Sequence, residues 1–197
     1  MEIITKTYPS YAAYLAHQAE KLDKSNGHAF TNPEKQVELF RQRFLDLPIP
    51  KGQTVLCLGA RCGEEVRAWF SVGHHAVGID VNPGKDNPYV TKGDFHHLPQ
   101  DDHSVDVVYT NCLDHALDLG QVLKEVTRVL RPHGWFVVDM VYGYDEGHTQ
   151  GEHDVMHWST ADGFARTLQY MTGMTRMLFR DLTDLGSPLT KQAVLTW

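Results

Sequence analysis

Val55-Leu56-Cys57-Leu58-Gly59-Ala60-Arg61-Cys62-Gly63-Glu64-Glu65 is the stretch of sequence that decides the fold. Its apolar run breaks into two glycines and then into helix formers, which is typical of a buried strand that turns sharply into a helix. Glycines at such a turn let the backbone approach a ligand with no side chain in between, and the strand end fixes where that ligand lies. We therefore expect a nucleotide-like cofactor to bind against Gly59 and Gly63.

Strand and helix patterns alternate on the C-terminal side of this turn. After the strand at 55–58 we expect a helix from 63 and a second helix over 119–131, the latter stopped by Pro132-His133-Gly134. This alternation predicts an α/β fold, in which a parallel sheet is covered on both faces. The further strands are expected at 76–80, 89–91, 105–110 and 135–140, followed by a polar loop, a helix at 160–171 and two strands at 174–182 and 192–197.

Two helices are expected before the turn. Tyr11, Tyr14 and Leu15 begin a stripe with helical spacing, and Asn32-Pro33 is a helix-start signal for a second helix that ends before Pro48. A polar hinge over 23–31 separates these two helices.

Length and composition point to one domain without a basic surface. The chain has 197 residues with 42% hydrophobic content, which is enough for one well-formed core and too little for two of ordinary size. A formal net charge of -7 argues against a protein that grips nucleic acid through its phosphates.

The cysteines and the N-terminus bear on the cellular compartment. Three cysteines with no CxxC pair indicate neither a disulfide framework nor a zinc site, so we expect a reducing, cytoplasmic protein. The first ten residues do not resemble an export signal, and no apolar run approaches the roughly 18 residues that a membrane span needs.

The number of glycines separates two classes of cofactor. A dinucleotide needs G-x-G-x-x-G, and Arg61 stands where the middle glycine would be. A ligand without phosphates, with an amino-acid end and a nucleoside end, is less demanding. Asp80 closes the next strand, about 20 residues after Gly59, where a carboxylate can accept from both ribose hydroxyls and would repel a 2′-phosphate. An NAD-dependent oxidoreductase stays open as an alternative.

Five successive motifs carry a family resemblance. They resemble, in order and spacing over about residues 50–140, those of the class I S-adenosylmethionine-dependent methyltransferases. The resemblance implies a three-layer α/β sandwich with a Rossmann-like, seven-stranded, mostly parallel sheet whose last strand is antiparallel. It also implies one domain over 1–197, with a helical cover at 1–50, a cofactor-binding core at 51–140, and an acceptor-side loop, helix and terminal hairpin at 141–197. The motifs are Gly59-Ala60-Arg61-Cys62-Gly63, Val77-Gly78-Ile79-Asp80-Val81-Asn82, Gly93-Asp94-Phe95-His96-His97-Leu98-Pro99, Ser104-Val105-Asp106-Val107-Val108-Tyr109 and Arg128-Val129-Leu130-Arg131-Pro132-His133-Gly134-Trp135.

The resemblance implies a role for particular residues around S-adenosylmethionine. The ribose would be bound by Asp80 with Val81 beside it, and the adenine by Asp94 and Phe95. The residues that would lie along the methionine part are Gly59, Ala60, Gly63 and Asn111.

Two positions depart from the usual pattern. Cys57 stands where many relatives carry an acid, which leaves the cofactor's ammonium group to backbone carbonyls or to another acid. Arg61 replaces a glycine and either pairs with the cofactor's carboxylate or is a solvated turn residue. These departures motivate a second alternative, a non-catalytic module that binds a cofactor or a partner.

Candidate catalytic residues follow the fourth strand of the predicted sheet. Methyl transfer is an in-line displacement, and a base is needed only for a hydroxyl or similar acceptor. His115 can take a proton near neutral pH, and Asp114 can orient it or act alone. The alternative is that both residues simply cap the helix that follows.

We expect no metal site, although the chain has 12 histidines. His153 and His157 lie in a polar loop whose glycines argue against the rigid helix that would place them on one face. For the acceptor we expect a small molecule or saccharide, methylated at oxygen or nitrogen. The segment Thr110-Asn111-Cys112-Leu113 departs from the Asn/Asp-Pro-Pro-Tyr pattern of enzymes that methylate bases, which disfavours nucleic acid.

Overall fold

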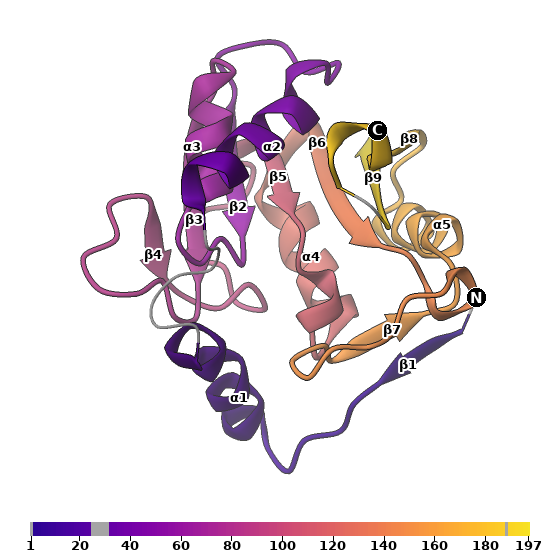
Figure 1. Ribbon diagram of the computed structural model, residues 1–197. Helices are drawn as coiled ribbons and strands as arrows, with labels where there is room; N and C mark the ends of the chain where they lie inside the picture. The colour runs from indigo at the N-terminus through magenta and orange to yellow at the C-terminus, as the bar shows by residue number, and fades with distance from the viewer. Residues whose placement is uncertain (1, 25–31, 188) are drawn as a thin grey trace.

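A seven-stranded sheet forms the centre of the molecule (Figure 1). The computed structural model describes residues 2–24, 32–187 and 189–197. Within these residues the strand order is β4-β3-β2-β5-β6-β9-β8; β2 to β6 run parallel, and β9 is antiparallel to both of its neighbours. This confirms the predicted fold class, including the antiparallel last strand. The strands are β2 (Thr54–Leu58), β3 (His75–Asp80), β4 (Val90–Lys92), β5 (Val105–Thr110), β6 (Leu130–Val141), β8 (Arg176–Asp181) and β9 (Thr190–Thr196).

Helices cover both faces of the sheet. Because side chains alternate along a strand, β2 contributes to two cores: Leu56 and Leu58 belong to one, and Val55 and Cys57 belong to the other. The first core also holds the apolar faces of α4 (Leu119–Val129) and α5 (Ala161–Thr172). The second holds those of α2 (Pro33–Leu45) and α3 (Glu64–Ser71). The fold is therefore a three-layer sandwich.

The helix starts follow the sequence signals. The Asn32 side chain accepts a hydrogen bond from the Lys35 amide at 3.0 Å, with Pro33 in the first turn of α2. Asp118 caps α4 in the same way, through the Gln121 amide at 2.9 Å. These side chains satisfy amides that the helix itself leaves unpaired.

Strand β6 begins earlier than its sequence pattern predicts. The predicted break at 132–134 lies inside the strand, which already starts at Leu130. The register against β5 shifts between Val105 and Val107, and His133 takes a positive φ of 65° there. The chain thus passes from helix to strand without a separate loop.

A second, two-stranded sheet was not predicted. Strand β1 (Ile3–Thr5) pairs antiparallel with β7 (Met156–Trp158), which lies in the region we interpreted as a polar loop. Figure 1 shows the two strands side by side, remote from each other in sequence. Three residues are too few for a periodic signal, so neither strand is recognisable locally.

The two N-terminal helices take different places. α1 (Tyr11–Lys24) lies at the carboxyl ends of the parallel strands, where its side chains line a cavity. α2 instead packs on α3 and the sheet, with Phe40 and Phe44 buried. The predicted hinge at 23–31 begins inside α1, and residues 25–31 lie outside the described residues. None of the helices in the described part is both long and apolar enough to cross a membrane.

Candidate functional site

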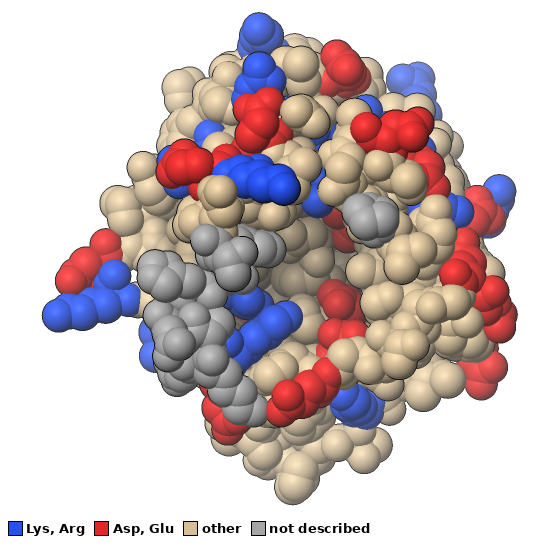
Figure 2. Space-filling view, in the orientation of Figure 1, with Lys and Arg blue, Asp and Glu red and all other residues tan. Residues whose placement is uncertain are grey.

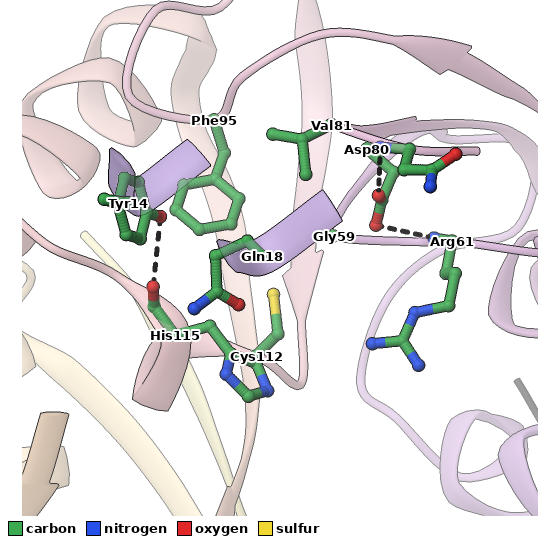
Figure 3. Close-up of a pocket in the computed structure, with 10 residues that line it drawn as sticks. Tyr14, Gln18, Gly59, Arg61, Asp80, Val81, Phe95, Cys112 and His115 are labelled. Atoms are coloured by element: carbon green, nitrogen blue, oxygen red, sulfur yellow. Dashed lines mark hydrogen bonds between the residues drawn. The ribbon is translucent and has the colours of Figure 1, made fainter. Parts of the chain in front are cut away.

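The carboxyl ends of β2, β3 and β5 open into a cavity beneath α1. A second cavity adjoins it, because both share Gly59, Arg61, Cys112 and His115. Figure 2 shows this face hollowed, with basic and acidic side chains around the hollow. Figure 3 shows the lining of the first cavity, which comprises Tyr14, Gln18, Gly59, Arg61, Asp80, Val81, Asn82, Phe95, Cys112 and His115.

The turn after β2 requires its glycines. A Cβ on Gly59 would lie 2.2 Å from the Cys112 sulfur, and one on Gly63 would lie 2.8 Å from the Cβ of Tyr89. Both residues also have positive φ angles, 68° and 89°. Gly59 lines both cavities and Ala60 lines the second, whereas Gly63 starts α3 and lines neither. The turn therefore brings the backbone of Gly59 and Ala60 to the cavities, and Gly63 acts at the start of α3 instead.

Asp80 faces the first cavity with its carboxylate already anchored. One oxygen accepts from the Asn82 amide at 2.8 Å and the other from the Arg61 amide at 3.0 Å (Figure 3). Burial raises the pKa of Asp80. A carboxylate oxygen can accept about two hydrogen bonds, so each oxygen retains capacity for one more donor. Two adjacent hydroxyl groups, such as those of a ribose, fit this remaining capacity.

Asp94 and Phe95 lie on different sides of the site. Phe95 lines the first cavity, whereas Asp94 borders an apolar slot between β4 and α1. Val81 lines both spaces and joins them. The other residues of the slot are Leu15, Ala16, Ala19, Lys92 and Gly93.

Three donors already surround the Asp94 carboxylate. The Tyr11 hydroxyl donates at 2.5 Å, and the His96 amide and ring Nδ1 both lie at 2.9 Å. Burial opposes ionisation here, but the hydrogen bonds from His96 and Tyr11 outweigh it and lower the pKa of Asp94 to about 2. Asp94 is therefore an ionised acceptor with room for about one further donor.

His115 lies at the join of the two cavities, in the short 3₁₀ helix η1 (Leu113–His115). Its Nδ1 lies 2.9 Å from the His153 carbonyl oxygen, which can only accept, so Nδ1 carries a proton. Its Nε2 then accepts from the Lys21 ammonium group at 2.8 Å. The expected orienting residue, Asp114, lies 3.7 Å from Nε2, so the His153 carbonyl sets the ring orientation instead. The helix that follows is capped by Asp118.

Side chains of α1 complete the site and were missed from the sequence. The Tyr14 hydroxyl donates to the His115 carbonyl at 3.0 Å, and the Gln18 amide donates to the His153 carbonyl at 2.9 Å. Lys21 lines the second cavity, where burial and then the charge of Arg61 lower its pKa. The spacing of Tyr14, Gln18 and Lys21 places them on one helical face, which was the available signal.

Asn111 and Cys112 complete the wall that follows β5. Asn111 lines the second cavity, and Cys112 lines both. Burial raises the pKa of Cys112 to about 12, so its thiol stays neutral. Possible metal-ligand atoms of Asp114, His115 and Asp154 cluster nearby, but both His115 nitrogens are already engaged.

Comparison with known proteins matches the central segment of the chain to a family model. A family model described as a methyltransferase domain matches residues 56–138, which span the glycine turn, Asp80, Asp94 and the η1 segment. This match covers less than half of the chain and makes residues 56–138 similar to a methyltransferase domain. Asp80 lies in the matched segment, and the capacity left on its carboxylate fits two adjacent hydroxyl groups such as those of a ribose.

Sequence relatives are methyltransferases with different acceptors. The chain is 34% identical over 130 residues to dimethylglycine N-methyltransferase of Parasynechococcus marenigrum, covering 55% of this chain and 46% of that protein. It is 29% identical over 135 residues to malonyl-[acyl-carrier protein] O-methyltransferase of Yersinia pestis, covering 64% and 45%. The chain thus spans about half the length of these curated relatives.

Solved structures share the fold at low sequence identity. One is a chain of the complex between the Trm112 methyltransferase activator and a methyltransferase from Haloferax volcanii, with a TM-score of 0.64, 21% identity, and coverage of 93% of this chain and 96% of that one. Another is phosphoethanolamine N-methyltransferase 1 of Haemonchus contortus with phosphoethanolamine and S-adenosylhomocysteine, with a TM-score of 0.66, 16% identity, and coverage of 95% and 49%.

Proposed function

We propose that this protein moves the methyl group of S-adenosylmethionine to oxygen or nitrogen of a small-molecule or saccharide-type acceptor. The observation that carries the proposal is the cavity at the strand ends, where the Gly59 turn, the partly free Asp80 carboxylate and α1 meet. Among the residues that the structure describes, α1 covers this cavity through side-chain hydrogen bonds, which favours a small acceptor over a folded macromolecule.

The residues around the cavity have separable tasks in this proposal. The sulfonium of the bound cofactor supplies the electrophilic methyl group. The chain's own contribution is alignment and exclusion of water: Asp80 would hold the ribose, and Val81 with the apolar slot would hold the adenine. Gly59 and Ala60 would border the methionine part together with Asn111.

His115 would take the proton of a hydroxyl acceptor at Nε2. That nitrogen accepts from Lys21 in the structure, so Lys21 must move away before the ring can act as a base. Asp114, at 3.7 Å from the same nitrogen, is placed to stabilise the protonated ring afterwards. An amine acceptor that is already neutral would need no such base.

Names of the relatives support both acceptor atoms. One matched relative is an N-methyltransferase of dimethylglycine, and another is an O-methyltransferase of malonyl-[acyl-carrier protein]. A nucleic-acid acceptor is disfavoured by the net charge of -7.

Calorimetric titration of the purified protein with S-adenosylmethionine, S-adenosylhomocysteine and NAD tests the proposal. We expect micromolar binding of the first two and none of NAD. Methyl transfer from labelled cofactor to a panel of hydroxyl and amine metabolites then identifies the acceptor. Binding of NAD alone would favour the oxidoreductase, and no binding of any of the three would favour a non-catalytic module.

A further inference from the structure

One buried carboxylate in the second cavity has no task in the function proposed above. Glu65, the second residue of α3, is 4% exposed and lines the cavity together with Arg61. The Glu65 carboxylate accepts a hydrogen bond from its own backbone amide. Within the described part of the chain, no other residue donates a hydrogen bond to it. A buried carboxylate whose one hydrogen-bond donor is its own amide is still energetically costly when ionised, so its position calls for a ligand or a proton.

The cavity around Glu65 has charges of both signs at its wall. Arg61 contributes a cation from the turn after β2, and Lys21 contributes a second from α1. Glu64, the other acid of the lining, already has an interaction elsewhere. An amino-acid group carries one ammonium and one carboxylate, so a wall with one acid that lacks a cationic partner and with nearby cations complements it.

We propose that Glu65 binds the α-ammonium group of the cofactor's amino-acid end, while Arg61 faces its α-carboxylate. This inference rests on the proposed function, because it assumes that the second cavity receives the amino-acid end of S-adenosylmethionine. It assigns to α3 an acid that the strand before the turn lacks, since Cys57 there is a buried neutral thiol.

The surroundings of Glu65 predict that its carboxyl group is protonated in the empty site and releases this proton when the cofactor binds. Burial raises the pKa of Glu65 to about 8, and the charges of Glu64 and Asp80 act in the same direction, while Arg61 opposes them. Facing neutral groups are the thiols of Cys57 and Cys112 and the phenol of Tyr109. At pH 7 the empty site therefore holds a protonated Glu65, and an ammonium ligand favours the ionised form.

Comparing two ligands distinguishes the contribution of the amino-acid end to binding from that of the nucleoside. S-adenosylhomocysteine carries both, whereas methylthioadenosine keeps the nucleoside and thioether without the amino-acid end. We expect Glu65→Gln to raise the dissociation constant of S-adenosylhomocysteine at least about tenfold, which is the scale of a lost charge-assisted hydrogen bond. The dissociation constant of methylthioadenosine should stay within about twofold of the wild-type value. Glu38→Gln, which removes the same charge from the exposed face of α2, should change neither.

Calorimetric titrations of the protein with S-adenosylhomocysteine at pH 7, in two buffers of different ionisation enthalpy, measure the number of protons released on binding. We expect the wild type to release close to one proton and Glu65→Gln to release none. Unchanged affinity in Glu65→Gln, an equal loss for both ligands, or no proton release by the wild type would overturn the inference. The wild-type proton count does not depend on the variant folding. Absence of S-adenosylhomocysteine binding to the wild type would instead overturn the proposed function.

Discussion

Replacing Asp80 with alanine should weaken cofactor binding more than it weakens the fold. The carboxylate lies at the end of β3 and accepts from the amides of Arg61 and Asn82, with capacity left for two ribose hydroxyls. Asp80→Ala would leave those hydroxyls without a charged acceptor in a half-buried site.

The magnitude follows from the number of contacts and the cost of burial. A hydrogen bond to a charged group contributes about 1.5 to 3 kcal/mol, and two hydroxyls could double that. Burial leaves the ionised Asp80 carboxylate poorly solvated in the empty site, which raises its pKa. This cost offsets part of the binding free energy that the two hydroxyl contacts contribute. We expect a net loss of about 1.5 to 3 kcal/mol, which corresponds to about 10- to 150-fold in the dissociation constant.

Calorimetry with S-adenosylhomocysteine measures the effect, with thermal unfolding of the ligand-free protein in parallel. Asp106→Ala is the matched control, because Asp106 also anchors a backbone amide, that of Thr54 at 2.8 Å, but lies at the amino end of β5. It should lower stability without changing affinity. A folded Asp80→Ala variant with the wild-type dissociation constant would refute the ribose assignment.

Four further substitutions test the catalytic group, a titrating carboxylate and, in two steps, the buried ion pair. His115→Ala should keep S-adenosylhomocysteine affinity while single-turnover transfer to a hydroxyl acceptor falls about 100- to 10,000-fold; unchanged transfer would exclude a base role. Because the folded pKa of Asp94, about 2, lies below its ordinary 3.8, its ionised form stabilises the fold above pH 4, and this is lost as pH falls toward 2. Urea unfolding should therefore show Asp94→Asn less stable by roughly 1 to 2 kcal/mol at pH 6, after allowance for partial exposure, with the difference shrinking toward pH 2; a constant difference would contradict this. Asp139→Leu leaves Arg43, paired to it at 2.8 Å, as a buried unpaired charge and should cost about 3 to 5 kcal/mol. Adding Arg43→Met should recover much of that loss in the same unfolding assay, and a double variant no more stable than the single one would argue against the ion-pair explanation.

Most of the sheet was predictable because its signals are local. The apolar run at 55–58 and the glycines after it predict β2 and the turn, and the strand at 105–110 has the predicted bounds. The pair β1 and β7 was not predictable, since each has three residues and is stabilised by a partner about 150 residues away.

The position of a helix on the sheet depends on contacts that no local pattern contains. Both N-terminal helices show an apolar stripe. Among the described residues α2 contributes to a core cluster and α1 does not, although Tyr14 of α1 is buried; in that cluster Phe44 stacks on Trp69 with ring centroids 4.1 Å apart. The rotation of α1 brings Lys21 to His115, and the rotation of α3 directs Glu65 into the cavity wall. Residues at strand ends were therefore found from the sequence, and residues presented by helices were not.

Helix α1 is held on the molecule by hydrogen bonds to residues that border the cavities, so its position depends on whether a ligand fills them. In the described part of the chain, neither core cluster includes a residue of α1; the helix is tied by hydrogen bonds to Asp94, His115 and Asn82, which border the ligand spaces. Such an element opens at a smaller free energy than the packed helices, so its amides should exchange with solvent earlier than those of α4. By thermodynamic reciprocity, the factor by which docking of α1 raises cofactor affinity equals the factor by which bound cofactor shifts the equilibrium toward the docked helix. Sequence variation in this helix can thus retune affinity without altering a single group beneath it.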